Sequence, residues 1–215
     1  MMHIKICCIA SDDEARLAIS YGASAIGLVA RMPSGPGPIA DELIFSIAKK
    51  IPPPIATFLL TCETSVAAIA DHHHRTCTNT IQIVDELTEG KYDELKSLLP
   101  AIKIVQVIHV TGEESIEEAV RISAHVDALL LDSGNPKLSV KELGGTGRVH
   151  NWQFSRKIVE QSKVPVFLAG GLNETNVRRA IDEVQPYGID LCSGVRTNGK
   201  LDKEKLGRFF DVVRQ

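Results

Sequence analysis

The sequence predicts an α/β fold in which eight parallel strands close into a (β/α)8 barrel. Eight apolar runs of strand length alternate with eight amphipathic segments of helical length. The apolar runs are continuous, which is typical of parallel strands that helices cover. The repeat averages roughly 26 residues, as in a compact TIM barrel. A doubly wound open sheet would also fit the alternation, but eight strands in order without a separate substrate domain favour the barrel.

Each element follows from its local pattern. The expected strands are Ile4–Cys8, Ala25–Val29, Ile55–Leu60, Thr80–Val84, Ile102–His109, Ala128–Leu131, Val164–Leu168 and Ile189–Cys192. The expected helices are Asp12–Tyr21, Asp41–Lys50, Thr64–His73, Tyr92–Leu98, Ser115–Ser123, Trp152–Gln161, Glu174–Glu183 and Lys203–Val213. Ser11, Asn151 and Asn173 stand where N-caps are expected, and Gly22 stands where a helix should end.

Length and composition favour one domain over residues 1–215 and exclude several classes of partner. With 215 residues and 44% hydrophobic content, one large core is the natural expectation. A net charge of -3 gives no reason to expect nucleic acid or an anionic membrane. The chain has no apolar run long enough to span a bilayer and no export signal, so we expect a cytoplasmic protein. Five cysteines without a CxxC spacing favour neither disulfides nor a metal site.

Two strands each deliver one proton-transfer group at the carboxyl end. Cys7 lies near the end of the first apolar run, and Asp132 follows the sixth. Parallel α/β folds place their chemistry at this end of the strands. A thiol and a carboxyl so placed predict acid/base catalysis. The competing interpretations are a small buried apolar residue for Cys7 and a turn or cap residue for Asp132.

Three glycine-bearing loops predict a phosphate site at the same end of the barrel. They follow the last three strands, and each one alone would be read as a plain turn. Backbone N–H groups in such loops can surround a phosphate dianion, and the loops after strands seven and eight often hold one. The residues expected to bind phosphate are Gly145, Gly147, Gly170, Gly171, Ser193 and Gly194.

These segments together resemble phosphoribosylanthranilate isomerase of tryptophan biosynthesis, from the first strand to the last helix. The resemblance rests on Lys5-Ile6-Cys7, Leu131-Asp132-Ser133, Gly144-Gly145-Thr146-Gly147, Ala169-Gly170-Gly171-Leu172-Asn173 with Asn176-Val177, and Asp190-Leu191-Cys192-Ser193-Gly194-Val195. It implies an Amadori rearrangement of N-(5-phosphoribosyl)anthranilate to 1-(o-carboxyphenylamino)-1-deoxyribulose 5-phosphate, without metal or organic cofactor. It also implies that Asp132 is the general acid and Cys7 the general base. The residues expected to contact this small phosphosugar are Lys5, Arg31, Gln82, His109, Asp190 and Arg196.

Four positions depart from the pattern of this family. Cys8 stands where a glycine usually follows the base, and Val84 replaces the histidine that usually ends the fourth strand. The usual arginine of the loop after the second strand, the expected partner of the anthranilate carboxylate, is missing, and Arg31 lies a few positions earlier. Arg196 stands where the family usually has glutamate.

The departures concern the end that would hold the aglycone, so three functions stay open. The first is a diverged isomerase with a relocated carboxylate clamp. The second is a paralogue that rearranges another phosphoribosyl amine, and the third is a non-catalytic phosphosugar-binding barrel. We expect a monomer or a homodimer.

Other conspicuous residues are expected to be structural. Consecutive histidines on a helix point in different directions, so His72-His73-His74 predicts a solvated helix end rather than a metal site. Cys62, Cys77 and Cys192 are expected to pack passively.

Overall fold

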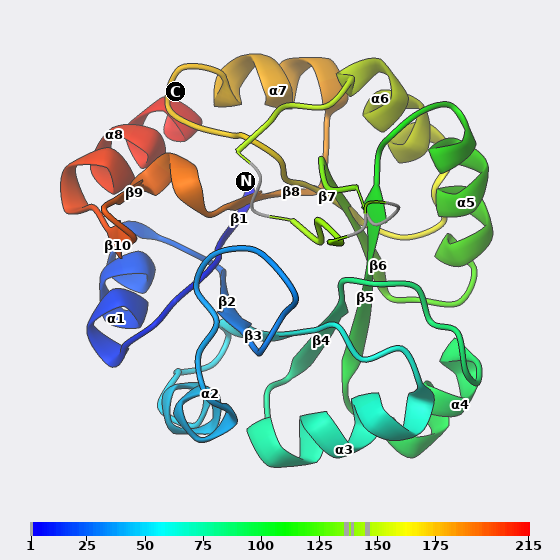
Figure 1. The fold of residues 1–215 in the computed structure, drawn as a ribbon. Helices are drawn as coiled ribbons and strands as arrows, with labels where there is room; N and C mark the ends of the chain where they lie inside the picture. The colour runs from blue at the N-terminus through cyan, green and yellow to red at the C-terminus, as the bar shows by residue number, and fades with distance from the viewer. Residues whose placement is uncertain (1, 136–137, 139, 145–146) are drawn as a thin grey trace.

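The computed structural model describes residues 2–135, 138, 140–144 and 147–215. Eight parallel strands pair in chain order, and β1 (His3–Ile6) pairs with β8 (Gly188–Leu191) to close the barrel. Figure 1 looks along the barrel, with the helices in an outer ring around the strands. The predicted (β/α)8 fold is confirmed.

The other elements follow in chain order around the ring. The strands are β2 (Ala25–Val29), β3 (Ala56–Thr61), β4 (Thr80–Ile83), β5 (Lys103–His109), β6 (Ala128–Asp132) and β7 (Val166–Leu168). The helices are α1 (Asp12–Tyr21), α2 (Asp41–Ala48), α3 (Val66–Thr76), α4 (Tyr92–Leu98), α5 (Glu114–Ser123), α6 (Trp152–Gln161), α7 (Val177–Val184) and α8 (Lys203–Arg214). After β8 come a short 3-10 helix, η1 (Ser193–Val195), and a two-stranded ribbon of β9 (Arg196–Thr197) and β10 (Lys200–Leu201).

The caps explain where the helices begin. Ser11 accepts a hydrogen bond from Glu14 N at 3.2 Å, and Asn151 accepts one from Gln153 N at 2.9 Å, as predicted. The predicted start of α7 is wrong, because the helix begins at Val177. The chain first makes a turn in which the Asn173 side chain accepts from Thr175 N.

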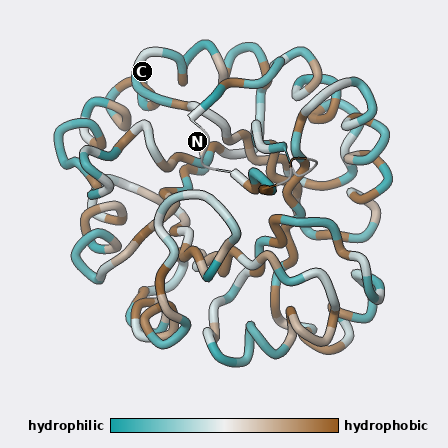
Figure 2. Tube along the Cα trace, viewed as in Figure 1, coloured by the Kyte–Doolittle hydropathy of each residue, from teal (hydrophilic) through white to brown (hydrophobic). Residues whose placement is uncertain are grey.

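The core has two parts, one inside the barrel and one between the strands and the helices. Figure 2 shows the hydrophobic residues concentrated along the strands and on the inner sides of the helices. Inside the barrel, the rings of Phe58 and Phe167 meet edge to face with centroids 6.1 Å apart. The two rings lie in the barrel at the level of Thr80 and Gly188, where β4 and β8 begin, which is the end opposite to the strand carboxyl ends.

The predicted solvated histidine tract is wrong for two of its three residues. His72 is buried between Thr61 Oγ1, 2.8 Å from its Nδ1, and Asp41 Oδ1, 3.2 Å from its Nε2. His73 is also buried and hydrogen-bonds to the carbonyl of Thr78 at 2.7 Å. Both histidines therefore tie α3 to neighbouring elements, and within the described ranges no group of three or more His, Cys, Asp or Glu is arranged to hold a metal ion.

The helices of the described ranges are all too short or too polar to cross a membrane.

Candidate active site

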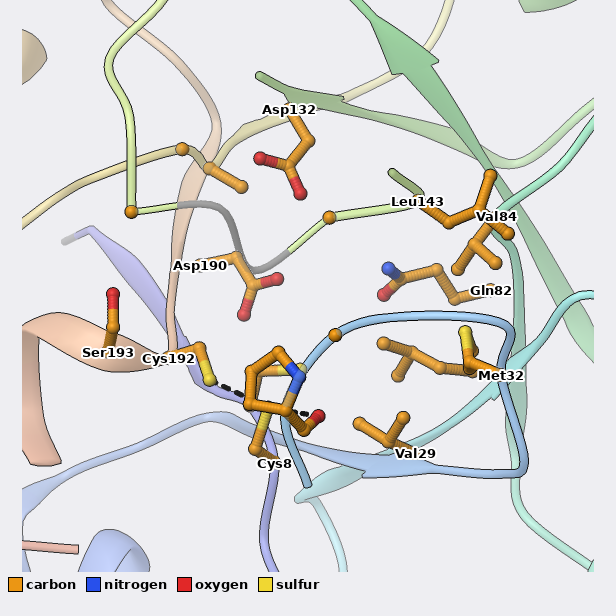
Figure 3. A pocket seen from close by; sticks show the side chains of 18 of the residues that line it. Cys8, Val29, Met32, Gln82, Val84, Asp132, Leu143, Asp190, Cys192 and Ser193 are labelled. Atoms are coloured by element: carbon orange, nitrogen blue, oxygen red, sulfur yellow. Dashed lines mark hydrogen bonds between the residues drawn. The ribbon is translucent and has the colours of Figure 1, made fainter. Parts of the chain in front are cut away.

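A pocket opens at the carboxyl ends of the strands and brings together segments from the whole length of the chain (Figure 3). Cys7 after β1 and Asp132 at the end of β6 both line it. The two predicted proton-transfer groups therefore face one cavity, as their positions at strand ends require.

The backbone at the end of β1 positions Cys7. Its N–H donates to Leu191 O of β8 at 2.7 Å, and its thiol packs against β2 at Gly27. A methyl group on Gly27 would lie 2.7 Å from Cys7 Sγ and 3.0 Å from Lys5 Nζ, so this glycine makes room for both side chains. A hydrogen bond from the Cys8 thiol lowers the pKa of Cys7, and the positive charge of Lys5 adds to this against the opposing effect of burial. These contacts therefore make Cys7 easier to ionise to the thiolate, the form that can accept a proton, than an ordinary cysteine.

Asp132 has the opposite electrostatic character. Its carboxyl group is buried, and burial raises its pKa despite a hydrogen bond from Ser133 N to Oδ1 at 2.7 Å. A methyl group on Gly144 would lie 2.6 Å from Asp132 Oδ2, so the loop after β6 covers the carboxyl group closely. Burial therefore makes the protonated form of Asp132, which can donate a proton, easier to reach than in an ordinary aspartate.

A buried ion pair lies beside Cys7. Lys5 Nζ is 2.8 Å from Asp190 Oδ2, and the Lys5 side chain is fully buried. Burial alone would lower the pKa of Lys5, but the charge of Asp190 raises it, so the ammonium group is retained.

Two buried acceptor atoms in the pocket lack partners among the described residues. They are Asp190 Oδ1 and Gln82 Oε1, and both side chains line the cavity (Figure 3). Buried acceptors without a donor are costly, so this arrangement fits a ligand that carries hydroxyl or N–H groups.

The glycine loops after β7 and β8 form the opposite wall. Gly170 and Gly171 have φ of 85° and 64°, a conformation that brings their backbone against the pocket. A methyl group on Gly194 would lie 2.1 Å from Leu172 O, so the two loops touch at this glycine. Gly147 and Ser193 also line the pocket. Gly145, the remaining residue of the predicted phosphate site, lies outside the described residues.

The other half of the pocket is apolar. Its lining residues are Val29, Met32, Leu60, Val84 and Leu143. The loop after β2 meets the loop after β6 here, where Ser34 Oγ donates to Lys141 O at 2.5 Å. No lysine or arginine lines the pocket among the described residues.

The structure separates the other predicted contact residues from the cavity. His109 hydrogen-bonds through Nε2 to Val84 O at 2.9 Å. Lys5 does not line the pocket itself but donates to Asp190, which does. The exposed Arg31 accepts a hydrogen bond at its carbonyl from Cys62 Sγ at 3.4 Å. Arg196 is buried below the loop after β1 against Glu14. Of the six predicted substrate contacts, Gln82 and Asp190 are the two that line the pocket.

Sequence reasoning missed two features of the site. Cys192, expected to pack passively, lines the pocket with its Sγ 2.7 Å from Cys8 Sγ. Glu14 lies in the predicted helix Asp12–Tyr21 and was not singled out, yet its carboxylate is the partner of Arg196. No local pattern connects residues this far apart, although the charge reversal at Arg196 was a signal that a new partner was needed.

Comparison with known proteins matches nearly the whole chain to a single protein family. The sequence model described as N-(5'-phosphoribosyl)anthranilate (PRA) isomerase matches residues 5–212. An N-(5'-phosphoribosyl)anthranilate isomerase of Methanosarcina acetivorans is 34% identical over 98% of this chain and 92% of its own. The protein named isomerase 2 of Methanosarcina mazei is 36% identical over 97% and 92%. The crystal structure of the Thermotoga maritima phosphoribosyl anthranilate isomerase superposes with a TM-score of 0.81 at 26% identity, over 100% of this chain and 99% of that one.

Proposed function

Because the chain belongs to the N-(5'-phosphoribosyl)anthranilate isomerase family, we propose that it converts N-(5-phosphoribosyl)anthranilate to 1-(o-carboxyphenylamino)-1-deoxyribulose 5-phosphate. One observation carries the proposal. A single pocket holds a thiol whose pKa is lowered, a carboxyl group whose pKa is raised, and glycine loops that fit a phosphate.

The reaction needs one proton donor and one proton acceptor. The carboxyl group of Asp132 donates a proton to the ring oxygen of the ribose, which opens the ring and leaves a Schiff base. The thiolate of Cys7 then removes the proton from C2, which gives the enolamine that tautomerises to the ketose product. The pKa of Cys7 is lowered and that of Asp132 is raised, so each shift is in the direction that these two roles require.

The wall contacts orient the sugar between these groups. The phosphate lies in the backbone cradle of Gly147, Gly170, Gly171, Ser193 and Gly194, with Gly145 as a further candidate. The ribose hydroxyls donate to the unpartnered Asp190 Oδ1 and Gln82 Oε1. The aromatic ring occupies the apolar half of the pocket.

The test is a fluorescence assay with freshly generated phosphoribosylanthranilate. Cys7→Ala and Asp132→Ala should each lower kcat by about a hundredfold or more, because each removes a general acid or base. Cys77→Ala removes an exposed thiol at the end of α3 and should keep full activity. A folded wild-type protein with no turnover would refute the proposal, as would full activity of either pocket variant.

A second candidate is the rearrangement of a phosphoribosyl amine without a carboxylate. It is favoured by the apolar lining and by the lack of lysine or arginine among the described residues of the pocket. The phosphoribosyl derivatives of anthranilate and aniline distinguish the two candidates. A higher kcat/KM for the aniline derivative supports the second one, and stabilisation by both compounds without turnover would indicate a non-catalytic binding protein.

We also propose a cytoplasmic protein that is a monomer or a homodimer and takes no nucleic acid partner. Light scattering at several protein concentrations measures the oligomeric state. A larger assembly would contradict this expectation.

A further inference from the structure

We propose that Arg196, through a buried ion pair with Glu14, is a positioning residue for Cys7. The inference rests on the proposed function, in which Cys7 is the general base. The pair of Arg196 and Glu14 would hold this base in position. The inference differs from the sequence-based expectation, in which Arg196 contacts substrate.

The guanidinium group of Arg196 is anchored on two sides. Its side chain is 6% exposed, and Nη1 and Nη2 lie 3.0 and 3.1 Å from the two carboxylate oxygens of Glu14. Such a two-point contact fixes the plane of the guanidinium group. Nη1 also donates to Gly199 O at 2.9 Å, in the turn between β9 and β10. Glu14 and Gly199 therefore fix the position of the guanidinium group independently of its contacts with the loop after β1.

The outer edge of Nη2 contacts the backbone carbonyls of Cys7 and Cys8. One N–H of Nη2 is directed to Glu14, so the other is shared between Cys7 O at 3.1 Å and Cys8 O at 2.5 Å. On the other side, Cys7 N donates to Leu191 O. Cys7 is thus fixed from β8 and from Arg196, with its thiol left toward the pocket.

Glu14 makes the support rigid. Its Oε2 accepts from Ala10 N at 3.0 Å and its Oε1 accepts from Leu201 N at 2.8 Å. One carboxylate thereby joins the loop after β1, the first turn of α1 and the ribbon strand β10. Arg196 is buried and Glu14 is partly buried, and loss of either charge would leave the other without its partner, so the two residues act as one unit.

The support is needed because Cys8 has an unfavourable backbone conformation. Its φ is 62°, in the left-handed region that favours glycine. A charged donor on the Cys7 and Cys8 carbonyls holds this conformation in place. The same conformation determines where the Cys8 thiol lies, and the hydrogen bond of this thiol lowers the pKa of Cys7. Loss of the donor should therefore loosen Cys8 and weaken the thiolate form of Cys7.

Several other titratable groups also face Cys7. They are Lys5 of β1, Asp190 of β8, the thiols of Cys8 and Cys192, and Asp132 across the pocket. Arg196 touches Cys7 at the carbonyl, so its effect on the thiol is transmitted by the backbone.

The decisive measurement is the rate of Cys7 alkylation by iodoacetamide as a function of pH, followed by mass spectrometry of the Cys7 peptide. It needs no substrate, so its result is independent of the proposed reaction. In Arg196→Met the midpoint should rise by about one pH unit, a tenfold change in the ionisation constant. Arg196→Lys should fall between Met and wild type, since an ammonium group keeps the charge but loses the planar fork.

Turnover of phosphoribosylanthranilate gives the second readout. Arg196→Met should lower kcat at least about tenfold with little change in KM, because a displaced base affects the chemical step. Glu14→Gln should act in the same direction. The double variant should resemble Arg196→Met alone, because both residues belong to one support.

A core variant separates positioning from stability. Ile69→Val in α3 changes a fully buried side chain outside the site and should lower the melting temperature without moving the alkylation midpoint. If Arg196→Met does not fold, the alkylation midpoints and kcat values of Arg196→Lys and Glu14→Gln test the proposal instead. Unchanged midpoints and kcat in the folded variants would overturn the proposal, even if their stability fell. Shifted midpoints in a protein without turnover would support the positioning role and refute the reaction.

Discussion

The Sγ atom of Cys192 lies 2.7 Å from that of Cys8, and both thiols line the pocket. This contact depends on the left-handed conformation of Cys8, at a position where the family pattern has glycine. The side chain of Cys8 therefore has two opposite effects, since it strains the backbone and it supplies a thiol to Cys7.

Cys8→Gly should separate these effects. We expect a gain of about 1 kcal/mol in the free energy of unfolding, because glycine adopts φ of 62° without strain. The acid limb of the pH dependence of kcat/KM should move to higher pH, because the hydrogen bond that lowers the pKa of Cys7 is lost. Cys8→Ala is the matched control, with the same shift of the limb but no gain in stability. Equal stabilities of the two variants would contradict the strain argument.

Asp132→Asn should abolish activity and alter stability in a pH-dependent way. The pKa of Asp132 is raised in the folded protein, so its contribution is present at low pH and lost as pH rises through the folded pKa. Asparagine keeps an acceptor for Ser133 N and never ionises. The stability of the variant relative to wild type should therefore increase with pH above the ordinary value of 3.8. Urea unfolding over a range of pH measures this difference, with Asp211→Asn on the exposed face of α8 as the control. A difference that falls with rising pH would refute the assignment.

Lys5→Met should destabilise the fold strongly. The variant leaves Asp190 buried with its charge uncompensated, which should cost about 3 kcal/mol. Lys50→Met is a matched control, because Lys50 pairs with Asp12 at 2.5 Å on the surface. That change should cost less than about 1 kcal/mol. Equal losses in denaturant titrations would show that burial does not govern the Lys5 pair.

Gly171→Ala should impair phosphate binding. The added methyl group would lie 2.8 Å from the carbonyl oxygens of Gly147 and Arg148, at a residue with φ of 64°. We expect KM to rise about tenfold, equivalent to ~1.4 kcal/mol of binding free energy. Gly199→Ala shares the positive φ but meets nothing within 4 Å, so it should cost about 1 kcal/mol of stability and leave KM unchanged. A KM unaffected by Gly171→Ala would place the phosphate elsewhere.

The strand order and the placement of Cys7 and Asp132 in one pocket were predictable because they depend on local patterns. Apolar runs mark the strands whatever surrounds them, and a residue at a strand end has only one rim of the barrel to occupy. Cys7 and Asp132 could therefore be assigned to the same pocket across more than half of the chain. The ranges of α1, α4 and α6 also follow from their periodicity and caps.

The partners of buried polar groups could not be predicted in this way. The contact of Arg196 with Glu14 joins residues 182 positions apart, and the burial of His72 depends on Thr61 and Asp41. In each case a tertiary contact decides whether the side chain is solvated. The backbone conformation of Cys8 is likewise imposed by its surroundings against the preference of the residue.

The division of the pocket into two walls has a consequence for evolution. The proposed phosphate wall comes from the loops after β7 and β8, while on the apolar side the loops after β2 and β6 are joined by the hydrogen bond from Ser34 Oγ to Lys141 O. Under the proposed function, mutations at this contact would change the amine-binding side of the pocket and leave the glycine loops unaltered. Exchange of the loops after β2 and β6 would then give the barrel a new amine partner while Cys7 and Asp132 stay in place.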